Sequence, residues 1–175
     1  QPSSITPITT TAGGRFVIGG LAPGRYHLYT SLVGFAPDTL PAIDVSAGDT
    51  TRVVVIGTPG SLNPVALGDT GATPVPGKGK LRVSHMAANA PAIDVYRTQP
   101  DYGSFVTFMD PFPYQASTPF IESTPGNWVI RVTRKGTDDV LAESGPIRVD
   151  ALWIRTILLL DTPDGGVKIT PLGEQ

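Results

Sequence analysis

The clearest fold signal in the sequence is the stretch WIRTILLLDTPDGGVKIT, residues 153–170. It opens with a mostly apolar run over 153–160, continues with turn-favouring residues over 162–166, and ends with a shorter run over 167–170. Two such runs around a Pro-Asp-Gly-Gly turn are typical of a β-hairpin. A helix over 150–161 is the alternative, because Ala, Leu, Trp and Ile can also follow a helical period.

The composition points to β-structure in the rest of the chain as well. The 175 residues include 20 glycines and 18 prolines, which is about twice the usual share. Because these residues cost about 1 and 3 kcal/mol in a helix interior, the composition argues against long helices, coiled coils and helical bundles. With 40% hydrophobic residues the chain can still bury a core, so global disorder is excluded too.

Charge and cysteine content exclude several function classes. The net charge is -2 and like charges do not cluster, so there is no nucleic-acid footprint. No apolar run reaches the roughly 18 residues of a membrane span. The absence of cysteine excludes disulfides, cysteine nucleophiles, zinc ribbons and iron-sulfur sites. Low charge and abundant threonine favour an exported protein, and because Gln1 follows no leader we expect a processed chain or a piece of a longer one.

The chain divides into three zones by pattern. The first, 1–57, contains short apolar or alternating runs that we expect to be strands, at 5–11, 15–18, 25–32, 42–45 and 51–56. The second, 58–80, is rich in proline and glycine and predicts a linker. The third, 81–175, carries further predicted strands before the hairpin, at 81–85, 93–96, 105–108, 128–133, 140–142 and 147–149. The sequence therefore predicts an all-β fold of two small antiparallel β-sandwich domains joined by a Pro/Gly-rich linker.

One local device occurs in both predicted domains. Ala-Pro-Gly-Arg-Tyr at 22–26 and Thr-Pro-Gly-Asn-Trp at 124–128 each place an aromatic residue two positions after a Pro-Gly pair. Such a pair predicts a type II turn, with the glycine at positive φ. We therefore expect Tyr26 and Trp128 to head inward-facing strands and to belong to the core.

The N-terminal motifs resemble a known family. They are TTAGGRF at 10–16, GLAPGRY at 20–26, VGF at 33–35 and VSAGDT at 45–50. Together they resemble the carboxypeptidase regulatory-like domain, which implies a small transthyretin-like β-sandwich. Members of this family usually carry one or two strands before the segment that corresponds to TTAGGRF at 10–16. Few residues precede that segment in this sequence, so we expect an N-terminally incomplete domain.

The C-terminal zone resembles the bacterial domain of unknown function 4397 (DUF4397) from about residue 80 onward. RVSHMAANAPAIDVY at 82–96 is similar to the family's opening pattern, from which Met86 and Asn89 depart. TPGNW at 124–128 matches its second signature, with Trp128 in the aromatic position. The resemblance implies an exported β-sandwich of the cell envelope or surface, with no established activity.

The sequence contains few candidates for catalysis. His27 and His85 are its only histidines, too few for a three-histidine zinc site, and no hydrolase elbow, P-loop or dinucleotide fingerprint is present. Ser84, His85 and Asp94 supply the residue types of a catalytic triad. Adjacent residues of a strand point to opposite faces, however, so we expect His85 and Asp94 to make structural hydrogen bonds at the strand entry. The prediction is no catalytic residue and no cofactor.

Two further groups of side chains are candidate sites. Asp138, Asp139, Asp161 and Asp164 could supply oxygen ligands for calcium but lack the alternation of a calcium loop, so we expect turn residues and no metal. The aromatic residues near Phe108, Pro111 and Pro113 could form a partner or ligand surface, with packing of a long loop over the sandwich as the alternative. The candidate surface residues are Tyr102, Phe105, Phe112, Tyr114 and Phe120.

These features favour a non-catalytic structural or interaction protein, an accessory or assembly subunit of the bacterial cell envelope, periplasmic or at the cell surface. The alternatives are a module that binds carbohydrate or another envelope ligand through the loop at 102–120, and a regulatory appendage of a peptidase. Expected partners are other protein subunits. A short first domain would also need its sheet edge covered, by residues 65–67, by the second domain, or by a strand donated from another chain.

Overall fold

A computed structural model describes residues 8–9, 16–31, 33, 37–48, 51–58, 61–68, 73–103, 106–108 and 110–172. The described residues form strands, turns and bends, with no helix among them, which confirms the all-β fold class. Among them there is accordingly no helix long and apolar enough to cross a membrane. The chain separates into two compact units, Gln1–Thr70 and Gly71–Gln175.

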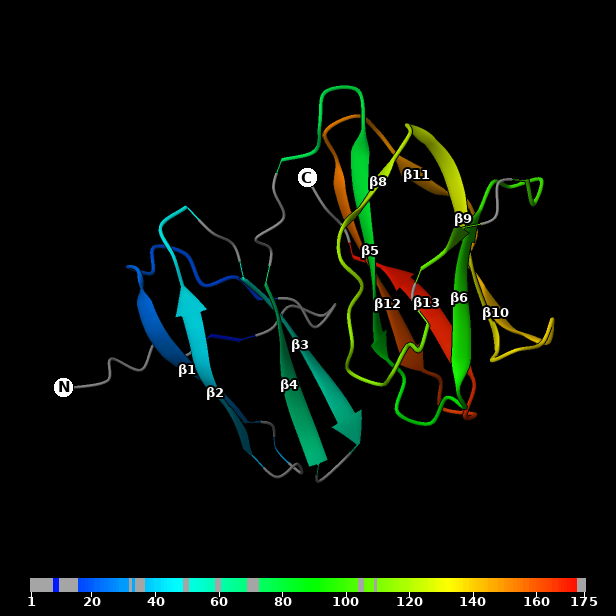
Figure 1. Cartoon of the computed structure of the whole chain (residues 1–175). Coiled ribbons are helices and arrows are strands. Elements are labelled where there is room, and N and C mark those ends of the chain that lie inside the picture. The colour runs from blue at the N-terminus through cyan, green and yellow to red at the C-terminus, as the bar shows by residue number, and fades with distance from the viewer. Residues whose placement is uncertain are drawn as a thin grey trace. The chain divides into compact units, whose positions relative to one another are not determined.

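The N-terminal unit contains two antiparallel strand pairs (Figure 1). Strand β1 (Gly24–Thr30) pairs with β2 (Asp38–Val45), and β3 (Thr51–Thr58) pairs with β4 (Ser61–Gly68). Among the described residues, its buried apolar side chains include Ile43 of β2, Ile56 of β3 and Leu67 of β4. The strand expected at 5–11 lies mostly outside the described residues, and the described part of the one expected at 15–18 is not a strand.

The segment expected to be a linker, 58–80, is not a linker throughout. Its residues Ser61–Gly68 form β4, and the first strand of the next unit starts at Gly79. Residues 65–67, one of the three segments that could cover a sheet edge, lie within β4 and pair with β3. Pro64 fits into β4 because β4 has a single partner strand in its sheet, and a proline without an N–H is tolerated on such an outer strand.

The C-terminal unit contains the remaining nine strands in two sheets (Figure 1). One sheet has the order β13-β12-β5-β8 and the other the order β10-β9-β6-β7, with β11 also paired to β9. The strands are β5 (Gly79–Met86), β6 (Ile93–Thr98), β7 (Val106–Thr107), β8 (Ile121–Ser123), β9 (Gly126–Arg134), β10 (Val140–Glu143), β11 (Ile147–Val149), β12 (Ile154–Asp161) and β13 (Val167–Pro171).

The hairpin predicted at 153–170 is confirmed, and the helix alternative over 150–161 is wrong. Strand β12 pairs antiparallel with β13, with Leu159 opposite Ile169. On its other side β12 pairs with β5 in parallel, which departs from the purely antiparallel expectation. Ile157, Leu158 and Leu159 are consecutive and all buried, so both faces of β12 are covered, and this explains why its apolar residues do not alternate.

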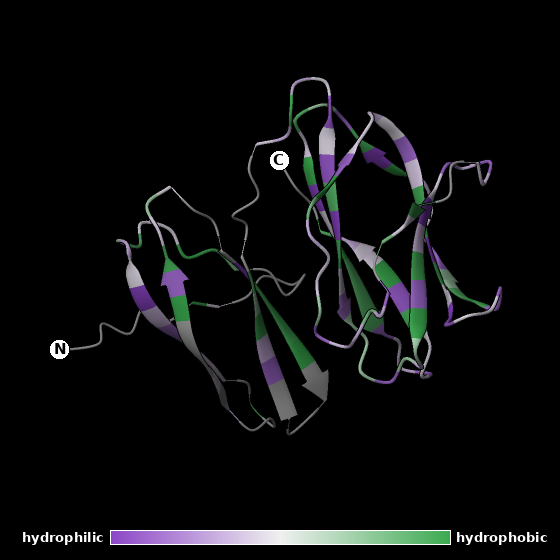
Figure 2. Cartoon of the chain, in the orientation of Figure 1, coloured by the Kyte–Doolittle hydropathy of each residue, from purple (hydrophilic) through white to green (hydrophobic). Residues whose placement is uncertain are grey.

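The core of this unit lies between the two sheets. Strands β5 and β12 contribute from one sheet, and β6 and β9 from the other, at alternate positions. These residues are Leu81, Val83, Ile157, Leu159, Ile93, Val95, Ile130 and Val132, joined by Phe108, Phe112 and Ile147. Figure 2 shows the resulting mixture of hydrophobic and hydrophilic bands along the strands. Each fully buried side chain of this kind stabilises the fold by about 1.5–3 kcal/mol.

The two Pro-Gly segments start strands, as predicted, but not through type II turns. Gly24 is the first residue of β1, opposite Val45, and its φ is not in the left-handed range. Gly126 is the first residue of β9, opposite Val149, and its φ of 154° is far from the value that a type II turn requires. Both glycines have joined the sheet, and a residue paired in a ladder needs a more extended backbone.

The aromatic residue in each segment instead reaches back over the proline. Tyr26 donates a hydrogen bond from its hydroxyl to the carbonyl of Ala22 (2.7 Å), and Trp128 donates from Nε1 to the carbonyl of Thr124 (3.0 Å). The expected core role holds for Trp128, which is buried. It does not hold for Tyr26, which is half-buried because the small N-terminal unit covers only part of its ring.

Candidate functional site

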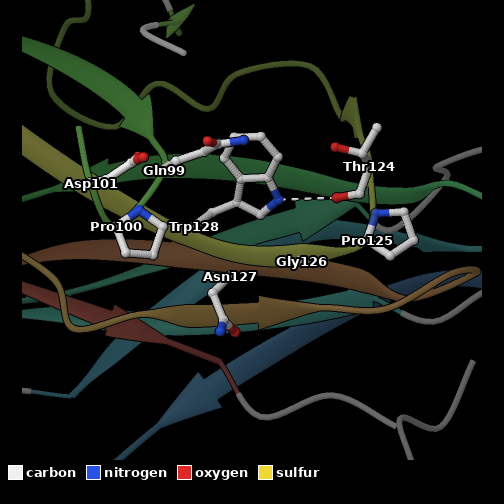
Figure 3. Close-up of a pocket in the computed structure, with 8 residues that line it drawn as sticks. All are labelled: Gln99, Pro100, Asp101, Thr124, Pro125, Gly126, Asn127 and Trp128. Atoms are coloured by element: carbon white, nitrogen blue, oxygen red, sulfur yellow. Dashed lines mark hydrogen bonds between the residues drawn. The ribbon is translucent and has the colours of Figure 1, made fainter. Parts of the chain in front are cut away.

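A hollow of about 340 Å³ opens on the surface of the C-terminal unit (Figure 3). One wall is the chain that follows β6, and the other is the segment that leads into β9. These two segments lie together because Thr98 of β6 pairs with Val129 of β9. The lining residues are Gln99, Pro100, Asp101, Thr124, Pro125, Gly126, Asn127 and Trp128.

The first wall is a closed turn. Gln99 donates its backbone N–H to the carbonyl of Gly103 (2.9 Å), and Tyr102 donates its own to the carbonyl of Gln99 (2.9 Å). Asp101 accepts the Gly103 N–H at Oδ1 (3.1 Å). Tyr102 takes a φ of 62° in this turn, a conformation that few residues other than glycine adopt. The three hydrogen bonds hold this turn in one shape.

The second wall is fixed by Trp128, which is only 6% exposed. Besides the bond to Thr124, its indole ring is covered by the guanidinium of Arg97, whose central carbon lies 4.3 Å from the ring centroid. Arg97 Nη1 donates to the Ser123 hydroxyl and to the Glu122 carbonyl. Trp128 is thus held at its edge and on one face.

Arg97 is itself an unusual buried group. It is 8% exposed, its Nε has no hydrogen-bond partner among the described residues, and none of their carboxylates pairs with it. Burial lowers the pKa of Arg97, because desolvation disfavours the charged guanidinium. The stack on Trp128 and two carbonyl or hydroxyl acceptors stabilise this charge in place of a counter-ion.

Tyr102, a predicted surface residue, is indeed exposed, at 50%. Its hydroxyl donates to Glu143 Oε1 (3.0 Å), and the guanidinium carbon of Arg131 lies 4.2 Å from its ring centroid. Arg131 in turn donates to Glu143, and this hydrogen bond is the main reason that the pKa of Glu143 is lowered. The exposed aromatic ring is therefore held in place by a small polar cluster.

The other predicted surface residues have different surroundings. Phe112 is buried in the core, and its ring lies edge-on to His85 (5.6 Å between centroids). Tyr114 is exposed and also lies edge-on to His85 (6.1 Å). Phe120 is half-buried against the guanidinium of Arg82 (4.4 Å). Phe105 lies outside the described residues.

The side chains considered as a triad have separate partners. Ser84 shares a hydrogen bond with the Ser117 hydroxyl (2.8 Å). Asp94 accepts the backbone N–H of Gly136 at Oδ2 (2.8 Å), which links the start of β6 to the loop after β9, as expected of a structural role. His27 lies on β1, exposed to solvent and in the other unit.

His85 is 3% exposed and accepts the Ala87 N–H at Nδ1 (3.4 Å), a long contact. Burial lowers the pKa of His85, because desolvation disfavours the imidazolium, and nearby Asp161 opposes this effect in part. Asp161 accepts the backbone N–H groups of Ala88 (2.9 Å) and Asn89 (3.0 Å). His85 and Asp161 thus stabilise the turn after β5.

The aspartates weighed as calcium ligands serve in turns and ion pairs. Asp139 pairs with Arg134 (3.2 Å). Asp164 lies in the β12–β13 turn, where the nearby Thr162 side chain is the main cause that lowers the pKa of Asp164. Within the part of the chain that the structure describes, no three His, Asp or Glu side chains lie close enough together to hold a metal ion.

Sequence reasoning missed the arginine-aromatic stacks of the C-terminal unit. The described part of the unit contains four, namely Arg82 on Phe120, Arg97 on Trp128, Arg131 on Tyr102 and Arg155 on Trp153. The sequence carries a signal for one of these stacks. Arg97 lies two and four positions after Val95 and Ile93 on β6, so its side chain is expected on the same core-facing side of the strand. The aromatic partners come from other elements and carry no such signal.

Comparison with known proteins supports the assignment of the N-terminal unit. Residues 1–56 match the family model of the carboxypeptidase regulatory-like domain, which confirms the resemblance of the N-terminal motifs. That domain is a non-catalytic regulatory and interaction module of β-sandwich form. No curated protein matches the chain.

Proposed function

We propose that this chain is a non-catalytic structural and interaction protein of the bacterial cell envelope, where it acts as an accessory or assembly subunit. The observation that carries the proposal is the match of residues 1–56 to an interaction module. The separate hydrogen-bond partners of Ser84 and Asp94 support a role without catalysis. The exported location rests on the low charge of the chain, on its abundant threonine and on the resemblance of residues 82–96 to DUF4397.

The N-terminal unit offers apolar surface for such a role. Val17, Tyr29 and Val33 are 83%, 63% and 98% exposed, although each is a large apolar or aromatic side chain. Tyr29 lies on the solvent side of β1, where the exposed residues alternate with half-buried ones. Six of the eleven exposed large apolar side chains of the described residues lie in this smaller unit, and they favour a protein partner because burying them stabilises both proteins.

The test is the assembly state of the full chain in its native source. We expect it to co-purify in fixed stoichiometry with other envelope proteins, and Tyr29→Ser together with Val33→Ser to release it. Val75→Ser is the matched control, since Val75 is 47% exposed in the C-terminal unit. A monomer without associated protein, or an assembly indifferent to the paired substitution, would contradict the proposal.

A further inference from the structure

We propose that the hollow between the turn at 99–103 and the start of β9 binds an uncharged sugar unit. This inference concerns the C-terminal unit and goes beyond the interaction role proposed above. It rests on the side chains that line the hollow, on the hydrogen bonds that its backbone already makes, and on the rigidity of its two walls.

The lining side chains fit hydroxyl groups. Gln99 carries a donor and an acceptor in one amide, and Asp101 carries acceptors only, whereas Asn127 points away from the Trp128 indole (Figure 3). A sugar hydroxyl both donates and accepts, so this combination can satisfy neighbouring hydroxyls on one ring. None of the described residues that line the hollow is a lysine or an arginine, and the Asp101 carboxylate disfavours an anionic ligand.

The floor of the hollow is apolar. Figure 3 shows the Trp128 indole between the two walls, with Pro100 on one side and Pro125 on the other. Small-molecule sites combine such an apolar surface with a few polar groups that orient the ligand. The exposed part of Trp128 is small, so it can contact the C–H groups of a ring without serving as a wide stacking platform.

The backbone at the hollow argues against an extended peptide as the ligand. A peptide that adds as a strand needs unpaired N–H and C=O groups. Here the N–H and C=O of Gln99 are both used within the turn, and the C=O of Thr124 accepts the Trp128 indole N–H. Recognition therefore falls to the side chains, as it does for sugars.

Both walls are organised in advance of binding. The turn at 99–103 is closed by its own hydrogen bonds, and Arg97 and Thr124 hold Trp128. Little conformational freedom is then lost when a ligand binds, which makes a weak polar ligand easier to hold. A volume of about 340 Å³ is near the lower end for ligand sites and suits a mono- or disaccharide.

The test is isothermal titration calorimetry of the full chain with maltose, cellobiose, mannobiose and N,N′-diacetylchitobiose. A galacturonate disaccharide and a proline-rich peptide serve as the anionic and peptide probes. We expect saturable binding of at least one neutral disaccharide, and weakening by about tenfold in Asp101→Asn, which removes a charged acceptor but keeps the shape. Gln99→Ala should weaken binding as well.

The matched control is Asp138→Asn, which changes the same residue type at an exposed position outside the hollow and should leave the affinity unchanged. Quenching of Trp128 fluorescence in a Trp153→Phe background gives a second readout at the site. No binding of any neutral disaccharide, stronger binding of the anionic or peptide probe, or affinity unchanged in both Asp101→Asn and Gln99→Ala would overturn the inference. The interaction role is tested separately, by the assembly state.

Discussion

The Arg97 guanidinium lies 4.3 Å from the centroid of the Trp128 indole ring, and both side chains are more than nine-tenths buried. Arg97 occupies the position after Ile93 and Val95 on the inward side of β6, while Trp128 precedes Ile130 and Val132 on β9. One end of the core is therefore closed by a cation over an aromatic ring. The same indole is the floor of the hollow.

Trp128→Ala should destabilise the C-terminal unit by about 3–5 kcal/mol, because it removes a large buried side chain and leaves a cavity beneath Arg97. Urea unfolding followed by circular dichroism measures this loss. Trp153→Phe, at a half-buried indole, is the control and should cost less. Emission of a fully solvated indole from Trp128 in the Trp153→Phe background would contradict its buried position.

Arg97→Met should retain more stability than Arg97→Ala. Methionine keeps apolar contact with Trp128 and removes the cost of a buried charge, so we expect a free energy of unfolding within about 1 kcal/mol of the parent. Arg97→Ala also uncovers the indole face and should lose about 2 kcal/mol. If both substitutions cost the same in urea unfolding, the guanidinium hydrogen bonds matter more than the packing.

Gly79→Ala should be strongly destabilising. An added Cβ would lie 2.5 Å from Val149 Cγ1 and 2.6 Å from the Asp150 carbonyl oxygen, so the start of β5 would have to move. Overpacking of this kind costs about 1–3 kcal/mol. Gly145→Ala is the matched control, since its Cβ would meet no atom within 4 Å. Equal thermal midpoints for the two variants would count against this close approach.

The stability of the C-terminal unit should fall as the pH is lowered below about 6.5. Burial lowers the pKa of His85 in the folded state, so the unfolded chain, with its ordinary value of 6.5, binds more protons. The contribution of neutral His85 is fully present above that pH and is lost as the pH falls toward the lowered value. Urea unfolding at several pH values measures it.

In the same titration, His85→Gln should remove this pH-dependent part, whereas His27→Gln, at an exposed position in the other unit, should leave it intact. A pH profile that is identical in the parent and in His85→Gln would show that other groups govern acid sensitivity.

Limited proteolysis with a protease of low specificity should cut first between residues 69 and 78. β4 is paired along its whole length with β3, and Thr73, Val75 and Gly77 are exposed. Exposed segments between paired strands are the usual sites of nicking. Mass spectrometry of the first fragments locates the cut, and a first cleavage within 61–68 would contradict the pairing of β4.

The predictable parts of the fold are those with strong local signals. The β12–β13 hairpin could be predicted because an apolar run and turn residues lie next to each other in sequence. β8 is only three residues long, and β4 contains Pro64, so neither carries a usable pattern. The type II turns failed because pairing with β2 and β11 overrides the local preference of Pro-Gly.

The candidate site was only half accessible to sequence reasoning. The Thr124–Trp128 wall stands out as a motif, but the wall formed by Gln99 and Asp101 becomes its neighbour only through the pairing of β6 with β9. The clustering of aromatic residues in the sequence does not predict a shared surface. Phe112 is buried in the core, whereas Tyr102 and Tyr114 are exposed.

The parallel pairing of β5 with β12 has a consequence for how this unit folds. Arg82 and Thr156, partners across it, are 74 residues apart in sequence. The chain loses conformational entropy when so long a loop closes, before the contacts between the two strands stabilise it. Contacts between residues so far apart in sequence therefore make folding slow. On the ribosome β5 is synthesised well before β12, and until β12 arrives its apolar strand lacks that neighbour and is open to aggregation.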